Sequence, residues 1–195
     1  VSRHDSPTYS AVFGTVLERL AMNDKRIVAI SAAMTAGTGL SGFAYRFPDR
    51  FFDVGISEEH AVVFAAGMAT QGFVPVFAVY STFLQRAVDC VLHDVCLQNL
   101  PVVFCIDRAG IVGDDGPTHH GVFDLSYLRS IPGLILAAPK DGNELKDMIQ
   151  TGLVCGEAFA VRYPRCRANF LENERAAKSI TLGQAELVFG KLPAK

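Results

Sequence analysis

The chain has 195 residues, of which 50% are hydrophobic and 19% charged, and its formal net charge at pH 7 is −2. This length suits one ordinary globular domain, and the composition is typical of a packed α/β domain. The small net charge lacks the basic footprint of nucleic-acid binding and offers no polybasic membrane patch. We therefore expect small molecules or proteins as partners, with no nucleic acid and no membrane.

The amino-terminal residues and the cysteines bear on location. Val1 is followed by neither a basic segment nor an apolar run, so we expect no signal peptide. The longest apolar stretch, residues 62–80, is broken by Thr70, Gln71 and Pro75 and is interpreted as helix, turn and strand. The five cysteines contain no CxxC pair, which predicts reduced thiols and a cytoplasmic protein.

Helical periodicity and short apolar runs alternate along nearly the whole chain. The first helix is predicted at residues 9–22, where apolar residues recur at helical spacing. Six β-branched apolar runs, each too short for a helix, predict buried strands at 27–30, 51–54, 74–79, 102–106, 134–137 and 159–161. Further helices are predicted at 40–45, 57–70, 83–98, 125–129 and 143–154.

This alternation predicts an α/β fold, with a mostly parallel six-stranded sheet and helices on both faces. We expect one domain at residues 1–167. After Arg167 the sequence becomes more polar, and we interpret residues 168–195 as a linker with the start of a further domain, including a possible strand at 180–189. Because ligands of such sheets bind outside the carboxyl ends of the strands, the loops after each strand are the candidate site.

Two carboxylates follow the second predicted strand. Ser57 is a candidate helix N-cap, and Glu58 and Glu59 stand in the first helical turn, where acids are also common because of the helix dipole. The apolar residues 61–67 that follow predict a buried helix. A carboxylate beside apolar side chains has its charged form disfavoured, so it can share a proton with a heterocyclic nitrogen.

The loops after the third and fourth strands hold aromatic and titratable groups. Phe83 could stack on a flat ring and Arg86 could hold an anion or pair with an acid, although a core phenylalanine and a surface arginine would look the same. Residues 107–121 contain Gly, Asp, Arg and His but little regular structure, which is typical of a functional loop. His119 and His120 are candidate acid–base groups, or plain surface residues.

Two other readings have weaker support. A zinc site from His93, His119, His120 and a cysteine lacks any standard ligand spacing. Residues 37–42 match the GxGxxG pattern of dinucleotide-binding folds, but six residues separate the strand from the first glycine, and Asp53 follows too soon to be the ribose-binding acid.

Taken together, these segments resemble the central domain of the 1-deoxy-D-xylulose-5-phosphate synthases, a transketolase-like family. The resemblance covers about residues 9–165. It is carried, in chain order, by residues 46–60, 80–87, 107–110, 115–121 and 162–165.

The resemblance implies thiamine diphosphate as the cofactor. Glu58 would bond N1′ of the aminopyrimidine and activate the cofactor, and Phe83 would stack on that ring, with Tyr80 and Arg86 beside it. Glu59 stands where the family often has Gln, although the register of the motif assigns the activating role to Glu58. Cys166 replaces the Gly that commonly follows the final arginine.

The resemblance also implies the substrates pyruvate and glyceraldehyde 3-phosphate, which give 1-deoxy-D-xylulose 5-phosphate and carbon dioxide for isoprenoid and thiamine biosynthesis. Tyr80, Arg108 and Arg165 match the family's residues around the acceptor phosphate, and guanidinium groups suit bidentate phosphate binding. Asp115 and His119 match those near its hydroxyl and carbonyl, and His119 would be the second catalytic residue.

Family members carry a further domain, with a GDG motif and a downstream Asn, that holds Mg²⁺ and the diphosphate. Neither is found here, because residues 113–116 belong to the matched loop. We therefore expect a fragment or a subunit of a split synthase that needs a diphosphate-binding partner, with a homodimer as the full enzyme. The alternatives are a related transketolase-type transferase, a 2-oxo-acid dehydrogenase β chain, or a non-catalytic domain for assembly or ligand sensing.

Overall fold

The structure, a computed structural model, describes residues 6–185 and 187. Its six strands form one sheet in the order β2-β1-β3-β4-β6-β5, and every pair of neighbours is parallel. The α/β class predicted from the sequence is therefore confirmed, with a fully parallel sheet in place of a mostly parallel one. The strands are β1 (Ile27–Ser31), β2 (Phe51–Asp53), β3 (Val74–Tyr80), β4 (Val103–Asp107), β5 (Ile135–Ala137) and β6 (Phe159–Arg162).

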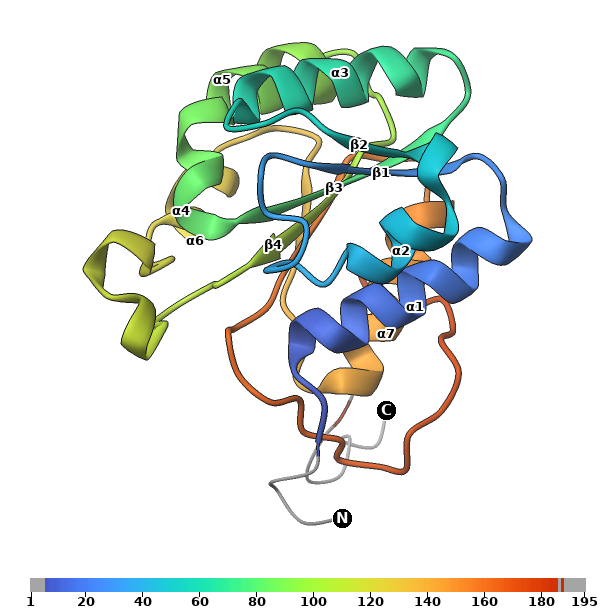
Figure 1. Cartoon of the computed structure of the whole chain (residues 1–195), viewed down its shortest axis with the longest axis vertical. Helices are drawn as coiled ribbons and strands as arrows, with labels where there is room; N and C mark the ends of the chain where they lie inside the picture. Colours follow the sequence, from blue (N-terminus) through green and yellow to red (C-terminus); the bar gives the residue numbers. More distant parts are fainter. Residues whose placement is uncertain (1–5, 186, 188–195) are drawn as a thin grey trace, which may run out of the picture.

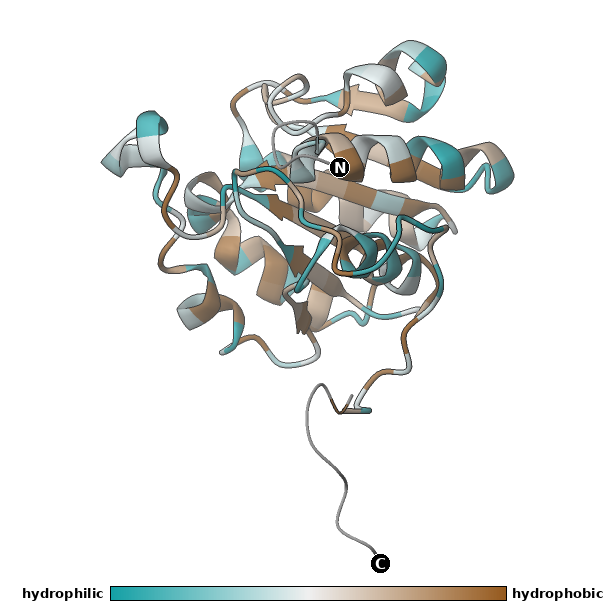
Figure 2. Ribbon diagram, turned by 90° about the horizontal axis from the view of Figure 1, so that it is seen from below, coloured by the Kyte–Doolittle hydropathy of each residue, from teal (hydrophilic) through white to brown (hydrophobic). Residues whose placement is uncertain are grey.

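Helices cover both faces of the sheet. One face carries α1 (Tyr9–Asn23), α2 (Ser41–Arg46) and α7 (Gly142–Val154), and the other carries α3 (Glu58–Thr70), the helical segment 81–96 and α6 (Asp124–Leu128) (Figure 1). Side chains of β3 alternate between the two cores, since Val76 packs with the first and Phe77 with the second. Burial on both faces explains why the strands are continuous apolar runs, seen as brown ribbons in Figure 2.

The single helix predicted at residues 83–98 is wrong in detail. The chain instead runs through α4 (Ser81–Leu84), a 3-10 turn η2 (Gln85–Ala87), α5 (Val88–Cys90) and a π-helical segment η3 (Val91–Cys96). Widened turns are visible in the hydrogen bonds from Leu97 N to Leu92 O and from Leu100 N to Val95 O. They keep the apolar residues of this segment on the sheet, and apolar spacing alone does not reveal such a change of helix type.

The residues after β6 return across α1 and α7. Ala168 N donates to Pro7 O at 2.8 Å, and residues 171–180 then lie along one face of α7. The predicted strand at 180–189 is not found where the structure describes it, and residues 186, 188 and 189 lie outside the described residues. None of the described helices is long and apolar enough to cross a bilayer.

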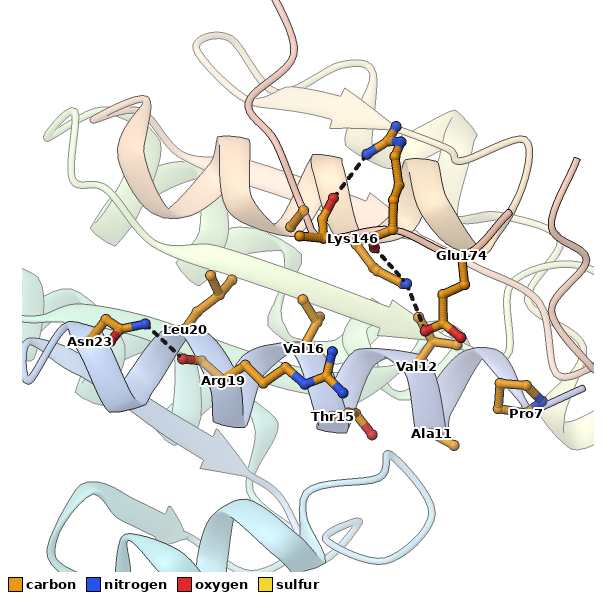
Figure 3. Close-up of a pocket in the computed structure, with 13 residues that line it drawn as sticks. Pro7, Ala11, Val12, Thr15, Val16, Arg19, Leu20, Asn23, Lys146 and Glu174 are labelled. Atoms are coloured by element: carbon orange, nitrogen blue, oxygen red, sulfur yellow. Dashed lines mark hydrogen bonds and ion pairs between the residues drawn. The ribbon is translucent and has the colours of Figure 1, made fainter. Parts of the chain in front are cut away.

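Polar contacts between α7 and residues 174–180 hold this tail against the helix, and we call this set of contacts the α7 ladder. Lys146 Nζ donates to Glu174 Oε1 at 2.8 Å and Arg175 O at 3.0 Å (Figure 3), and Asp147 accepts from both terminal nitrogens of Arg175 at 2.8 and 2.6 Å. Thr151 Oγ1 accepts from Ile180 N at 2.8 Å. A cavity of about 230 Å³ remains between α1 and the tail, lined mainly by side chains of α1 and by residues 174–177.

Candidate functional site

The strand order places a topological switch between β1 and β3. From β1 the chain moves to one side of the sheet to form β2 and then returns to the other side to form β3, so the loops that leave β1 and β3 diverge. Ligands of open parallel sheets bind at such a point, outside the carboxyl ends of the strands. The loops that the sequence singled out all emerge at this edge.

Three aromatic side chains meet there. The rings of Tyr80 and Phe83 are stacked with centroids 5.6 Å apart, and the His119 ring meets Phe83 edge-on at 5.2 Å. Burial raises the pKa of the Tyr80 phenol, with Arg108 acting in the opposite direction. Phe83 and His119, which are 36 positions apart in the chain, thus form one partly buried surface with Tyr80.

Arg108 is the most constrained residue at this edge. Its backbone has a φ of +60°, in the left-handed region that residues other than glycine rarely adopt. Its guanidinium lies 4.0 Å above the centroid of the Tyr80 ring, and Nη1 donates to Gly37 O at 2.7 Å. The side chain is only 12% exposed. A left-handed residue at a candidate site indicates strain held in place by its surroundings.

Asp115 joins two arginines. Its Oδ2 lies 2.9 Å from Arg165 Nε and 3.6 Å from Arg108 Nε. Two guanidinium groups from different loops thus converge on one anion, which is the arrangement expected of a phosphate site. We call the six residues Tyr80, Phe83, Arg108, Asp115, His119 and Arg165 the edge cluster.

Behind the edge cluster lies Asp107, the last residue of β4, with no exposed surface. Its carboxylate accepts from Ser10 Oγ at 2.6 Å and from Arg108 N at 2.7 Å, and its Oδ2 lies 3.3 Å from Arg108 Nη1. Burial raises the pKa of Asp107, and the Ser10 and Arg108 contacts act to lower it.

Glu58 occupies the first turn of α3 and is 1% exposed. Its Oε2 lies 3.3 Å from Arg86 Nη1, and the Arg86 side chain is half exposed. Ser57 flanks the helix without a side-chain capping bond, so the predicted cap is not formed. Glu59 is exposed, which separates the two neighbouring acids clearly by environment. Arg86 follows Phe83 by three residues, so segment 81–96 connects Glu58 to the edge cluster.

Several buried polar atoms at this edge have no hydrogen-bond partner. Among the described residues these atoms are Ser81 Oγ, Thr82 Oγ1, Arg108 Nε and Tyr163 OH. All four belong to residues that directly follow or lie close after β3, β4 or β6. Buried polar atoms without hydrogen-bond partners are rare in folded proteins, and their concentration after three strands sets this edge apart from the rest of the described chain.

Sequence reasoning missed three supporting residues, namely Gly37, Ser10 and Asp107. Gly37 allows a close approach, since a Cβ there would lie 1.7 Å from Tyr80 OH, and Gly39 has a φ of +83° and packs against Ser10 O. The glycines of the GxGxxG match therefore shape the loop after β1, with Gly37 supporting the edge cluster. The six residues between the predicted strand 27–30 and the first glycine of this match were one sign in the sequence that the glycines do not bind a dinucleotide.

Asp53 ties the loops after β1 and β2 together. Burial acts to raise its pKa, but hydrogen bonds from Ala33 N, Gly55 N and Thr35 Oγ1 outweigh this and hold the pKa below its ordinary value. His120 Nδ1 accepts from Val112 N at 3.2 Å, so this histidine supports the loop. Across the described residues no group of three His, Cys, Asp or Glu side chains is arranged to hold a metal ion.

A parallel sheet with aromatic, acidic and arginine side chains gathered at the carboxyl ends of its strands defines an α/β domain with a candidate ligand site at that edge. The sequence profile described as "Transketolase, pyrimidine binding domain" matches residues 5–169. The chain therefore belongs to the family of transketolase pyrimidine-binding domains.

The individual relatives are synthases and transketolases. The 1-deoxy-D-xylulose-5-phosphate synthase of Syntrophus aciditrophicus (strain SB) is 59% identical over 182 residues, which cover 93% of this chain and 28% of the relative. That of Aquifex aeolicus (strain VF5) is 59% identical over 186 residues, covering 95% and 30%. The chain thus spans less than a third of the length of these relatives.

Solved structures show the same fold. Transketolase from Campylobacter jejuni subsp. jejuni NCTC 11168 aligns with a TM-score of 0.78 and 23% identity, covering 96% of this chain and 28% of that one. A protein described as "Split gene transketolase, inactive beta4 tetramer" also gives a TM-score of 0.78, with 24% identity, covering 92% and 58%. These matches confirm that the sheet and its helices form a transketolase-type pyrimidine-binding fold.

Proposed function

We propose that the chain is the pyrimidine-binding part of a thiamine-diphosphate-dependent enzyme that condenses pyruvate with glyceraldehyde 3-phosphate to 1-deoxy-D-xylulose 5-phosphate and carbon dioxide. The 59% identity to a curated synthase over 93% of the chain carries this proposal. The edge cluster supports it, because its six residues come from three loops and lie close together in space.

The residues present fit the aminopyrimidine of thiamine diphosphate. Glu58 is buried, and its Oε2 pairs with the half-exposed Arg86, which leaves the carboxylate with acceptor capacity for a ring nitrogen. Phe83 offers a flat apolar ring of the size that stacks on a heterocycle. When bound, thiamine diphosphate supplies a carbon centre that attacks a 2-oxo acid and stabilises the electron pair left when carbon dioxide departs.

In this proposal the chain supplies acid–base groups and anion binding. Glu58 holds and exchanges a proton at N1′ of the pyrimidine. Arg108 and Arg165 bind the phosphate of the aldehyde acceptor, with a phosphate oxygen competing for the place that Asp115 Oδ2 takes between them. His119 donates a hydrogen bond to the acceptor carbonyl oxygen, and Asp115 accepts from its hydroxyl.

Other parts of the enzyme are assigned beyond this chain. The described residues do not fit a Mg²⁺ site, so we assign the metal and the diphosphate to another domain or subunit. We also propose a homodimer as the full enzyme. A domain boundary at residue 167, with residues 168–195 leading to a further domain, remains a prediction.

A chimaera tests the proposed function. This chain would replace the matching segment of the Syntrophus aciditrophicus synthase, and carbon dioxide release from pyruvate would be measured with and without glyceraldehyde 3-phosphate. We expect release that depends on the aldehyde. A folded chimaera that binds thiamine diphosphate but releases no carbon dioxide would contradict the proposal and favour a non-catalytic domain.

The two neighbouring acids provide a matched control. We expect Glu58→Gln to lower kcat by roughly 10²-fold or more, the usual size of an acid–base contribution. Glu59→Gln should leave kcat nearly unchanged, because Glu59 is exposed at the same helix start. The reverse result would assign the activating role to Glu59.

A further inference from the structure

Arg108 is held from behind by a buried carboxylate that no part of the proposed chemistry uses. Asp107 accepts from the Arg108 backbone N–H at 2.7 Å while its other oxygen lies 3.3 Å from Arg108 Nη1. One carboxylate therefore contacts both the strained backbone and the guanidinium of the same arginine. This double contact fixes the backbone turn and the side-chain direction together.

Helix α1 anchors the carboxylate in turn. Ser10 Oγ donates to Asp107 Oδ2 at 2.6 Å across a separation of 97 residues in the chain. The same Nη1 of Arg108 donates to Gly37 O at 2.7 Å, and the guanidinium carbon lies 4.0 Å from the centroid of the Tyr80 ring. The Arg108 side chain is thus held by three contacts, to Gly37 in the loop after β1, to Tyr80 at the end of β3, and to Asp107, the residue before it.

Ordering the arginine side chain before a ligand arrives favours anion binding. An arginine side chain has many rotamers, and a ligand must overcome the entropy of ordering them unless the protein has already ordered the side chain. A guanidinium aimed in advance therefore binds a phosphate more tightly than a free one with the same charge.

We propose that Asp107, anchored by Ser10, is a positioning residue that aims the Arg108 guanidinium and thereby sets the preference for a phosphorylated over an unphosphorylated aldehyde acceptor. The substrate part of this inference rests on the proposed function. Asp107 itself touches neither substrate nor cofactor, and it acts through Arg108.

The kinetic test compares two acceptors in the chimaera. Asp107→Asn keeps the size of the side chain but presents an NH₂ group toward Ser10 or Arg108, so one of the contacts is lost. We expect KM for glyceraldehyde 3-phosphate to rise roughly tenfold, the size of one charge-assisted hydrogen bond. KM for pyruvate and kcat/KM for D-glyceraldehyde should change less than twofold. An equal loss with both acceptors, or an unchanged KM for the phosphorylated one, would overturn the proposal.

Two further variants separate positioning from folding. Asp147→Asn is the matched control, since Asp147 is also a buried aspartate paired with an arginine, Arg175, but on α7. It should lower stability without changing the acceptor preference. Ser10→Ala, which removes only the anchoring hydroxyl, should shift the preference in the same direction as Asp107→Asn but by a smaller factor, and no shift would contradict the role of Ser10.

A measurement on the 195-residue chain does not depend on activity. We expect the Arg108 Nε–H signal in ¹⁵N NMR to exchange slowly with solvent, because the side chain is 12% exposed. Asp107→Asn should speed this exchange roughly tenfold, whereas Asp147→Asn should affect Arg175 and not Arg108. Unchanged Arg108 exchange in Asp107→Asn overturns the positioning role. A chimaera without turnover, by contrast, would reject the proposed function alone.

Discussion

Both the edge cluster and the α7 ladder involve buried charged side chains, Asp107 behind the cluster and Asp147 in the ladder. The two regions differ in how many of their buried polar atoms have hydrogen-bond partners. In the ladder, Asp147 accepts from Arg175 through both oxygens and from Lys178 N, and Thr151 both donates and accepts. At the carboxyl edge, four buried polar atoms have no hydrogen-bond partner among the described residues, and Arg108 is held at a φ of +60°.

This difference separates polar groups that are fully bonded within the fold from polar groups that are not. A fully satisfied buried network rigidifies the fold, whereas unpaired atoms and backbone strain lower its stability and persist where another requirement retains them. Burial of charge alone would not have distinguished the two regions. The hydrogen-bond partners do, and the following predictions test the distinction.

The largest expected effect is in the ladder. Asp147→Ala leaves Arg175 without its carboxylate, and we expect a loss of about 3 kcal/mol in the free energy of unfolding, near the low end for a broken buried pair because Arg175 is partly exposed. Urea unfolding of the chain measures this, with the exposed Lys25→Ala as a control that should change stability by less than about 0.5 kcal/mol. Equal midpoints for Asp147→Ala and wild type would show that the ladder contributes nothing.

A pair of identical substitutions compares the regions directly. Thr151→Val should destabilise the chain by about 1.5 kcal/mol, because Ile180 N loses its acceptor. Thr82→Val removes a buried hydroxyl that has no partner, so it should be neutral or stabilising by up to about 1 kcal/mol. Both changes are followed by urea unfolding. Destabilisation of the same size at the two positions would erase the difference between the regions.

A smaller effect on stability is expected at Gly37. The methyl group of Gly37→Ala would meet Tyr80 OH. Because the phenol can swing outward, we expect a loss of about 1 kcal/mol in the free energy of unfolding, together with displacement of the Tyr80 ring from Arg108. NMR signals of the Tyr80 ring and of Arg108 Nε–H report this movement. Gly67→Ala, where no atom lies within 4 Å of the new methyl, should leave both signals in place.

The smallest effect concerns acid pH. Because its hydrogen bonds lower the pKa of Asp53 in the folded state, its contribution to stability is present above the unfolded value of about 3.9 and is lost as pH falls through the lower folded value. The difference in unfolding free energy between wild type and Asp53→Asn should therefore shrink below about pH 4. A difference that grows on acidification would mean that the pKa shift has the opposite sign.

The strands were predictable because of their burial on both faces. Runs such as residues 74–79 are continuously apolar, which is the pattern of a parallel strand between two helical layers, and all six predicted strands are found. The interrupted helix at 81–96 was not predictable in the same way. Its π-helical turns change hydrogen-bond spacing while leaving apolar residues on the buried side.

The candidate site divides along similar lines. The loops with Glu58, Phe83, Arg108 and His119 stand out in the sequence, because titratable and aromatic residues directly follow apolar strands. The supports did not stand out. Ser10 contacts Asp107 across 97 residues, and a serine in the first turn of a helix carries no sign of a distant partner.

The sequence by itself determined the succession of strands and helices along the chain, the edge of the sheet at which a site is expected, and the family resemblance, because these depend on local patterns and on the residues that follow each strand. Only the tertiary structure decided that Glu58 is buried while Glu59 is exposed, that the Asp107 carboxylate contacts both the backbone and the guanidinium of Arg108, and that residues 171–180 pack against α7. These depend on contacts between segments far apart in the chain, whose distances and directions are set by packing around the sheet.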